Sequence, residues 1–181
     1  MTQEIYIENI ANILKNKPRL ERELKIKITN KGKDFFLDGT AENEYLALKV
    51  FEAMELGFSA EKALLLKNET NILHRIEIKK ITKRHDLERI RARIIGTHGK
   101  TIGNLSRLSH CHLALNNNQI GIIGDAELID EAILAVKSIV QGSKQGNVYT
   151  RLEKETKKRR YNPEYNQYIK NELKKKQSLN N

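Results

Sequence analysis

Apolar and polar residues follow one another along the chain in an order that appears twice. In the first 66 residues the order is strand, helix, short helix, strand, strand and long helix, over residues 4–8, 9–16, 18–25, 25–29, 34–39 and 42–56. The short helix is expected to begin at Pro18, because proline lacks a backbone N–H and suits a first helical turn. An apolar stripe predicts the inward face of the long helix, at Tyr45, Leu48, Val50, Phe51 and Met54.

After a short helical segment at 57–66, the same order returns. The pattern predicts a strand, two helices, two strands and a helix, over residues 74–81, 86–95, 100–109, 112–115, 119–123 and 126–141. Asp125 is expected to cap the last helix and Gly142 to end it. The repeat predicts an α+β fold of two tandem modules of order β-α-α-β-β-α, each with a three-stranded sheet packed on helices. We place the modules at 1–66 and 67–150, before a basic, helical C-terminal tail at 151–181.

The charge of the chain is unevenly distributed. The net charge of the 181 residues is +10. Residues 1–66 carry 10 Lys and Arg against 11 Asp and Glu, whereas residues 67–150 carry 13 against 8 and residues 151–181 carry 10 against 4. Clustered cations favour a polyanionic partner, because they release counterions from its phosphates. A nucleic acid is therefore expected on the second module and the tail.

The cell compartment is indicated by residues that the sequence lacks. Cys111 is the single cysteine, which excludes an intramolecular disulfide and fits a reducing compartment. No apolar stretch approaches the ~18 residues of a membrane helix, and the opening MTQEIYIENI lacks the layout of a signal peptide. We expect a cytoplasmic protein with no membrane partner.

Residues 94–101 read IIGTHGKT and fit two kinds of phosphate-binding loop. A P-loop NTPase needs a glycine five residues before Gly99, where this chain has Ile94, and a buried strand before the loop. Here a charged segment with helical periodicity precedes the glycines, and no Walker-B aspartate follows an apolar strand. The P-loop is therefore disfavoured. The second interpretation, a Gly-x-x-Gly backbone clamp of the RNA-binding kind with neither catalysis nor a cofactor, is favoured, although two glycines alone are a weak signal.

The residues around the glycines resemble the KH family. The similarity covers roughly residues 72–142 and follows the pattern IGxxGxxIxxL from Ile95 onward. The segments GFSAEKAL (57–64), IIGD (122–125) and GSKQGNVYTRLEK (142–154) narrow the resemblance to the two-KH proteins of archaeal and eukaryotic small-subunit ribosome assembly. That group includes the KRR-type processome factors and Partner of Nob.

The resemblance implies a function without chemistry of its own. The resemblance implies a protein that binds small-subunit pre-rRNA near its 3′ end. It also implies that the protein works beside a maturation endonuclease and a dimethyltransferase. The first module has KNKPRL where the clamp would lie, and a proline without a glycine cannot bring the backbone close to a phosphate. An alternative therefore stays open, that of a protein-interaction scaffold with a vestigial clamp that recruits the endonuclease or the methyltransferase.

The expected RNA contacts gather around the Gly-x-x-Gly loop. They are Arg89, Arg93, Ile95, Gly96, Thr97, His98, Gly99, Lys100, Thr101, Asn104, Arg107 and Leu113. Lys100, Asn104 and Arg107 share a helical face by their spacing. For the two arginines that precede the loop, RNA contact and simple solvation are both open. In the alternating strand pattern Leu113 points inward. It belongs to the core or lies at the edge of the surface on which the RNA bases would lie.

Two further patterns lie outside the clamp. The run His110-Cys111-His112 suggests a metal site, but alternate strand residues point to opposite faces, so we expect no metal and an inward, structural Cys111. The tail carries KKRR at 157–160, KKK at 174–176, and tyrosines at 161, 165 and 168. These residues fit RNA contact, protein docking or a solvated arm.

Overall fold

The computed structural model describes residues 2–83 and 85–160. The first part of the chain forms β1 (Thr2–Tyr6), α1 (Ile10–Leu24), β2 (Lys27–Lys31), β3 (Asp34–Asp38), α2 (Ala41–Glu55), α3 (Ala60–Ala63) and the 3-10 helix η1 (Leu64–Lys67). The second part forms β4 (Asn71–Glu77), α4 (Ile78–Ile81), α5 (Leu87–Ile95), the 3-10 helix η2 (Thr97–Gly99), α6 (Lys100–Ser109), β5 (His112–Asn116), β6 (Gln119–Asp125), α7 (Ile129–Gln141) and α8 (Gln145–Arg160).

The strands form two antiparallel three-stranded sheets, which confirms the predicted α+β class. Their orders are β1-β3-β2 and β4-β6-β5, so in each sheet the third strand lies between the first two. The last two strands of each sheet form a hairpin, and its turn contains a residue with positive φ, Gly32 in one and Asn117 in the other. The tandem arrangement of two KH modules, with its boundaries, stays a prediction.

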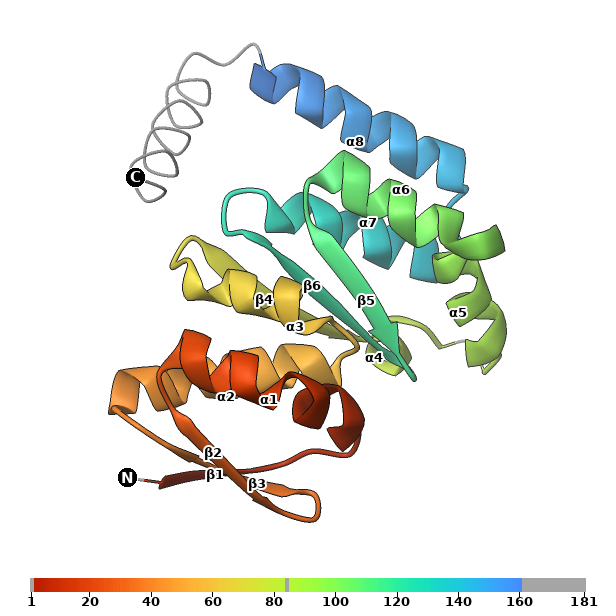
Figure 1. Cartoon of the computed structure of the whole chain (residues 1–181). Helices are drawn as coiled ribbons and strands as arrows, with labels where there is room; N and C mark the ends of the chain where they lie inside the picture. Colours follow the sequence, from red (N-terminus) through yellow and green to blue (C-terminus); the bar gives the residue numbers. More distant parts are fainter. Residues whose placement is uncertain (1, 84, 161–181) are drawn as a thin grey trace.

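The sheets and helices stack in alternating layers (Figure 1). From the N-terminal end of the molecule the layers are the first sheet, α1 to α3, the second sheet, α5 to α7, and α8. One buried apolar cluster fills the space around α1 and α2, and another lies beneath α5 to α8. Ile123 of β6 belongs to the first cluster, although its neighbour Ile122 belongs to the second. The second sheet is therefore covered on both faces.

The second sheet meets the first module at Gly121 of β6. A side chain here would lie 2.6 Å from the ring of Phe58 and 3.2 Å from Leu56, both of which follow α2. Asn116 adds a polar contact, since its side-chain amide donates to the carbonyl of Glu55 at 2.7 Å. The glycine thus allows the two halves of the molecule to approach closely.

Several predicted helix and strand boundaries were wrong, and two of them have a clear physical reason. Pro18 lies inside α1 and does not begin a new helix, because Ile13 and Leu20, on either side of it, are buried in one core. That shared burial offsets the ~3 kcal/mol that a proline inside a helix costs through its missing hydrogen bond and the clash of its ring. Residues 78–81 form α4 instead of extending the strand, since Glu77 already pairs with Gln119, the first residue of β6.

Asp125 does not cap the last helix of the second module. It ends β6, its carboxylate accepts from the N–H of Glu127, and α7 begins only at Ile129. Gly142 ends α7 as predicted, with φ +108°. Tyr45 is also not inward, because 61% of its surface is exposed, whereas Ala47 takes the buried place on that face of α2.

The predicted tail begins within α8, which starts at Gln145 and crosses residue 150. The tyrosines at 161, 165 and 168 and the lysines at 174–176 lie outside the described residues. Among the helices that the structure describes, none is long and apolar enough to cross a membrane.

Candidate nucleic-acid interface

The Gly-x-x-Gly loop connects α5 to α6 through an unusual backbone. Gly96, His98 and Gly99 have φ values of +71°, +53° and +74°, which side chains rarely tolerate. A Cβ atom on Gly96 would overlap the hydroxyl of Thr101 and lie 2.8 Å from its backbone nitrogen. Around Gly99 there is open space within 4 Å of such an atom. Gly96 therefore allows the loop to pack closely against Thr101 of α6. Gly99 instead allows the backbone to adopt the positive φ with which the chain turns into α6.

The loop presents donors to the outside. Thr97, His98 and Lys100 are exposed, and 41% of Ile95 is exposed. The backbone N–H groups of Thr97 and His98 have no acceptor among the described residues. The start of α6 follows at once, and a helix N-terminus favours an anion. Two free donors, a helix terminus and the Lys100 ammonium together suit a phosphate group.

The predicted contacts before and after the loop have different surroundings. Arg93 is half-buried, and its guanidinium donates to the carbonyl of Ser143 at 2.8 Å, which holds it against the start of α8. Arg89 is exposed on the same helix. On α6, Asn104 is half-buried and Arg107 is exposed, one and two turns after Lys100. Arg89 and Arg107 are thus available to a ligand, whereas Arg93 already has a structural partner.

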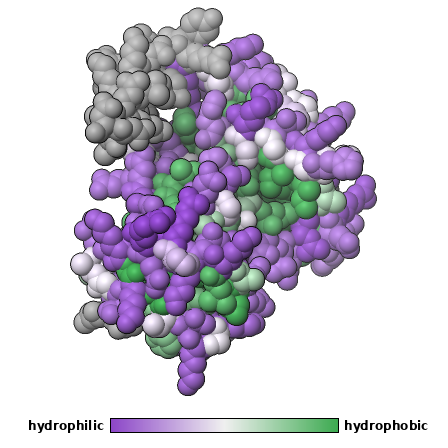
Figure 2. Space-filling model, viewed as in Figure 1, coloured by the Kyte–Doolittle hydropathy of each residue, from purple (hydrophilic) through white to green (hydrophobic). Residues whose placement is uncertain are grey.

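An apolar surface lies between the loop and the edge strand β5. Figure 2 shows an apolar area where β5 faces α5 and α6. Leu113 itself is a core residue with 8% exposure. Ile102 on α6 and Leu115 on β5 are only partly buried. Neither was among the predicted contacts, although the same alternation and the IGxxGxxI pattern single them out. At the edge of β5, the N–H of Leu113 donates to the Ser106 hydroxyl at 3.2 Å.

The residues of the His110-Cys111-His112 run point to different surroundings. Cys111 is 1% exposed and packs against Gly124, so its predicted inward position is confirmed. Burial raises the pKa of its thiol to about 11, although a hydrogen bond with Ser109 opposes this shift. His110 is exposed, and partial burial, followed by the charge of Lys62, lowers the pKa of His112. Among the described residues no cluster of three metal-binding side chains occurs.

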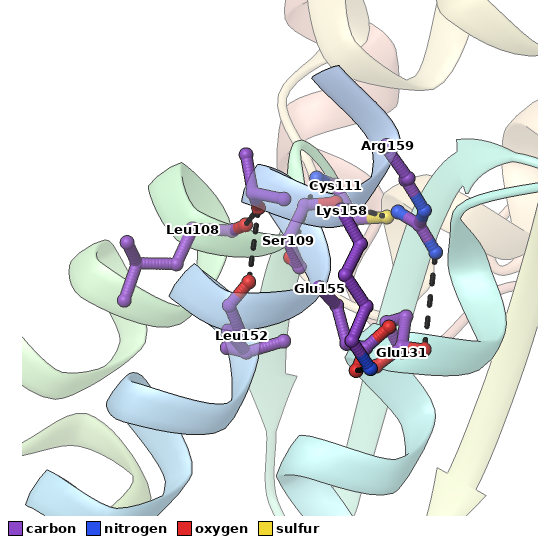
Figure 3. A network of polar contacts seen from close by, with 9 residues as sticks. Leu108, Ser109, Cys111, Glu131, Leu152, Glu155, Lys158 and Arg159 are labelled. Carbon is purple, nitrogen blue, oxygen red and sulfur yellow. Dashed lines mark hydrogen bonds and ion pairs between the residues drawn. The ribbon is translucent and has the colours of Figure 1, made fainter. Parts of the chain in front are cut away.

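α8 lies along α6 and α7 and completes the second core. Its residues Val148 and Leu152 are buried in that core. Farther along, the hydroxyl of Thr156 lies 3.2 Å from the carbonyl of Leu108 on α6, and Arg159 lies 3.9 Å from Glu131 on α7 (Figure 3). α8 is thus fixed against both neighbours over most of its length.

The family of the second module follows from a comparison with known proteins. Residues 72–157 match the family model described as eukaryotic type KH-domain, KH-domain type I. This segment is therefore similar to a KH domain. In a KH domain, a Gly-x-x-Gly loop clamps the backbone of about four nucleotides. In this chain the Gly-x-x-Gly sequence lies at residues 96–99, between two helices and within the segment that matches the family model.

Relatives and solved structures extend the similarity beyond the KH domain. A KH domain-containing protein of Methanocaldococcus jannaschii is 27% identical over 154 residues, which cover 78% of this chain and 66% of that protein. The chain thus spans slightly less than two thirds of that relative.

Two of the similar structures are from Pyrococcus horikoshii OT3. Dim2p is 28% identical with a TM-score of 0.77, over 85% of this chain and 99% of that one. A chain of the a/eIF2alpha–aDim2p–rRNA complex is 27% identical with a TM-score of 0.79, over 87% and 95%. A protein of unknown function from Aeropyrum pernix has a TM-score of 0.74 over the full length of both chains, but at 23% identity it shows the fold alone.

Proposed function

We propose that the protein binds single-stranded RNA through its KH domain and acts in small-subunit ribosome assembly and pre-rRNA processing. The observation that carries this proposal is the exposed loop of Gly96 to Gly99, with two unpaired backbone donors before the start of α6. The complex of aDim2p with rRNA supports the choice of rRNA as the polymer. We further propose the cytoplasm as the compartment and a site near the 3′ end of small-subunit rRNA. In this role the protein acts by binding and catalyses nothing.

The proposed contacts divide into phosphate and base contacts. The N–H groups of Thr97 and His98 and the Lys100 ammonium meet the phosphates, and Arg107 continues the positive charge along α6. Bases lie over the apolar area where β5 faces α5 and α6. The partly buried Ile102 of α6 and Leu115 of β5 are the side chains proposed to contact them. Phosphate contacts of this kind set affinity, whereas base contacts set sequence preference.

A test of the clamp places negative charge where the phosphates should lie. Thr97 and His98 are both exposed, so changing both to Asp should leave the fold intact. Each added carboxylate would repel a phosphate a few ångströms away by roughly 1–4 kcal/mol. We expect the affinity for a short single-stranded rRNA fragment, measured by fluorescence anisotropy, to fall by at least about tenfold.

The matched control adds the same two charges far from the loop. Thr29 and Asn30 are consecutive, exposed residues on the edge strand β2. Their double change to Asp alters the net charge equally and should lower affinity by only about twofold. If the folded Thr97→Asp, His98→Asp protein bound RNA as tightly as this control, the clamp would have no role in binding.

A scaffold function is the second candidate, and the continuity of α1 favours it. The KNKPRL segment, which occupies the position of a clamp in the first module, is helical throughout and lies within α1. This module therefore has no loop for a phosphate at that place and suits contact with a protein. The proposed partners are the rRNA maturation endonuclease and the dimethyltransferase. Binding of either purified enzyme after complete nuclease treatment would support this function, and loss of binding would favour RNA as the only link.

A further inference from the structure

The start of α8 contacts the clamp from behind. The side-chain amide of Gln145 donates to the backbone carbonyl of Arg93 at 3.1 Å and to the hydroxyl of Thr101 at 3.0 Å. Arg93 lies in the last turn of α5, and Thr101 is the second residue of α6. A neutral amide has two hydrogens, so both donors of Gln145 are used. One side chain from a third helix thus connects the two helices on either side of the loop.

Both acceptors of Gln145 are important for the geometry of the loop. The carbonyl of Arg93 is one of the last four carbonyls of α5. Such carbonyls accept no hydrogen bond from an N–H of their own helix and need a partner from outside it. Thr101 is the buried residue on which Gly96 packs, with its Cβ 2.7 Å from the position that a side chain on Gly96 would take. By holding these two groups, Gln145 fixes the separation of α5 and α6 where the loop begins and ends.

Gln145 is itself held firmly. Gly142 ends α7 in a left-handed turn, and the N–H of Ser143 donates back to the carbonyl of Ser138, so only a short connection precedes α8. The guanidinium of Arg93 donates to the carbonyl of Ser143 and adds a further link between the end of α5 and this connection. Val148, one turn after Gln145, is buried in the core.

We propose that Gln145 is a positioning residue of the RNA clamp. It touches no RNA, but it holds the loop in the conformation that presents the backbone donors of Thr97 and His98. The expected effect of Gln145 on RNA affinity rests on the proposed function. Its expected effect on the conformation of the loop does not, because that effect is measured in the RNA-free protein. When only a fraction of molecules has the competent loop, apparent affinity falls by that fraction. α8 then has two roles: its first residue holds the loop in place, and its apolar residues pack in the second core.

The first test removes the two donors and keeps a side chain of comparable bulk. Gln145→Leu should weaken binding of the single-stranded rRNA fragment about fivefold to tenfold, since two hydrogen bonds that hold the loop are lost. Gln141 is an exposed glutamine at the end of α7, without a hydrogen bond from its side chain among the described residues. Gln141→Leu is the matched control and should change affinity less than about twofold.

The second test separates positioning from general destabilisation. Amide hydrogen exchange of residues 96–100 in the RNA-free protein should become faster in Gln145→Leu, whereas exchange in β6 stays unchanged. In the Thr97→Asp, His98→Asp background, Gln145→Leu should cause no further loss of affinity. A loss of the same size in both backgrounds would indicate a role unrelated to the clamp and would overturn the proposal.

The outcomes also distinguish this proposal from the proposed function. If the wild-type protein does not bind RNA, the proposed function fails, and exchange at residues 96–100 still decides whether Gln145 holds the loop. If exchange at the loop is unaltered in Gln145→Leu, the positioning role fails even where RNA binds. Should that variant not fold, Gln145→Met, which keeps a flexible side chain of similar length, replaces it in both measurements.

Discussion

The two glycines of the clamp should differ in what they contribute to stability. Both have positive φ, but Gly96 lies at φ +71°, ψ 174°, a region that is almost closed to other residues, whereas Gly99 lies at φ +74°, ψ 11°, in the left-handed helical region. Gly96→Ala costs about 1–3 kcal/mol for the backbone. Gly99→Ala costs about 1–2 kcal/mol and meets no neighbour within 4 Å.

Packing against Thr101 adds to the cost at Gly96. The new methyl group would overlap the Thr101 side chain and lie 2.8 Å from its backbone nitrogen, which cannot move away without shifting α6. Overpacking of this kind costs typically about 1–3 kcal/mol. The total for Gly96→Ala is then about 2–6 kcal/mol, a large share of the ~5–15 kcal/mol that stabilises an ordinary domain.

Denaturation separates the two substitutions. For a chain of this size 1 kcal/mol shifts Tm by about 2–4 °C, so a loss near 4 kcal/mol in Gly96→Ala corresponds to about 8–16 °C. Urea unfolding followed by circular dichroism gives the free energies directly. Adding Thr101→Ala to Gly96→Ala should recover part of the loss, because it removes the overlapping hydroxyl. Equal destabilisation by Gly96→Ala and Gly99→Ala would refute the packing argument.

Three other parts of the fold give further measurable outcomes. Burial raises the thiol pKa of Cys111 from 9.0 to about 11, so a thiol reagent should label the protein only as it unfolds, and stability should fall as the pH rises above 9. Burial lowers the pKa of His112 from 6.5, so unfolding should become easier as the pH falls below 6.5, and His112→Gln should reduce that pH dependence in thermal melts. In urea unfolding, Gly121→Ala should lower the free energy of unfolding by about 1–3 kcal/mol, because the new methyl group would overlap Phe58. Gly103→Ala, on an open face of α6, should raise the free energy of unfolding by about 1 kcal/mol, because alanine favours a helix more than glycine does.

Local patterns allowed most of the KH domain to be predicted. The bounds of α6, the end of α7 at Gly142 and the inward side of Cys111 depend on residues close together in sequence. Apolar periodicity and turn glycines report such features directly. The clamp could be predicted for the same reason, because its glycines, its first basic residue and the helix after them are contiguous.

The errors occur where distant residues decide the structure. Pro18 is accommodated in α1 because residues on both sides of it share one core, which the local preference of proline does not reveal. Tyr45 was assigned to the core in place of Ala47, since a small alanine contributes little to a hydrophobic pattern. Gln145 lies 52 residues from Arg93 and 44 from Thr101, so no spacing rule connects them.

The stacking of the layers restricts how a single strand of RNA can meet the KH domain. One face of the second sheet is covered by its own helices and the other by the first module. At its open edge, the N–H of Leu113 is already bonded to Ser106, so an added strand cannot use a full row of backbone groups on β5. The apolar residues Ile102 and Leu115 offer contact area without hydrogen bonds. If the loop binds RNA as proposed, we expect base selection to depend on polar side chains near it, foremost the half-buried Asn104 on α6.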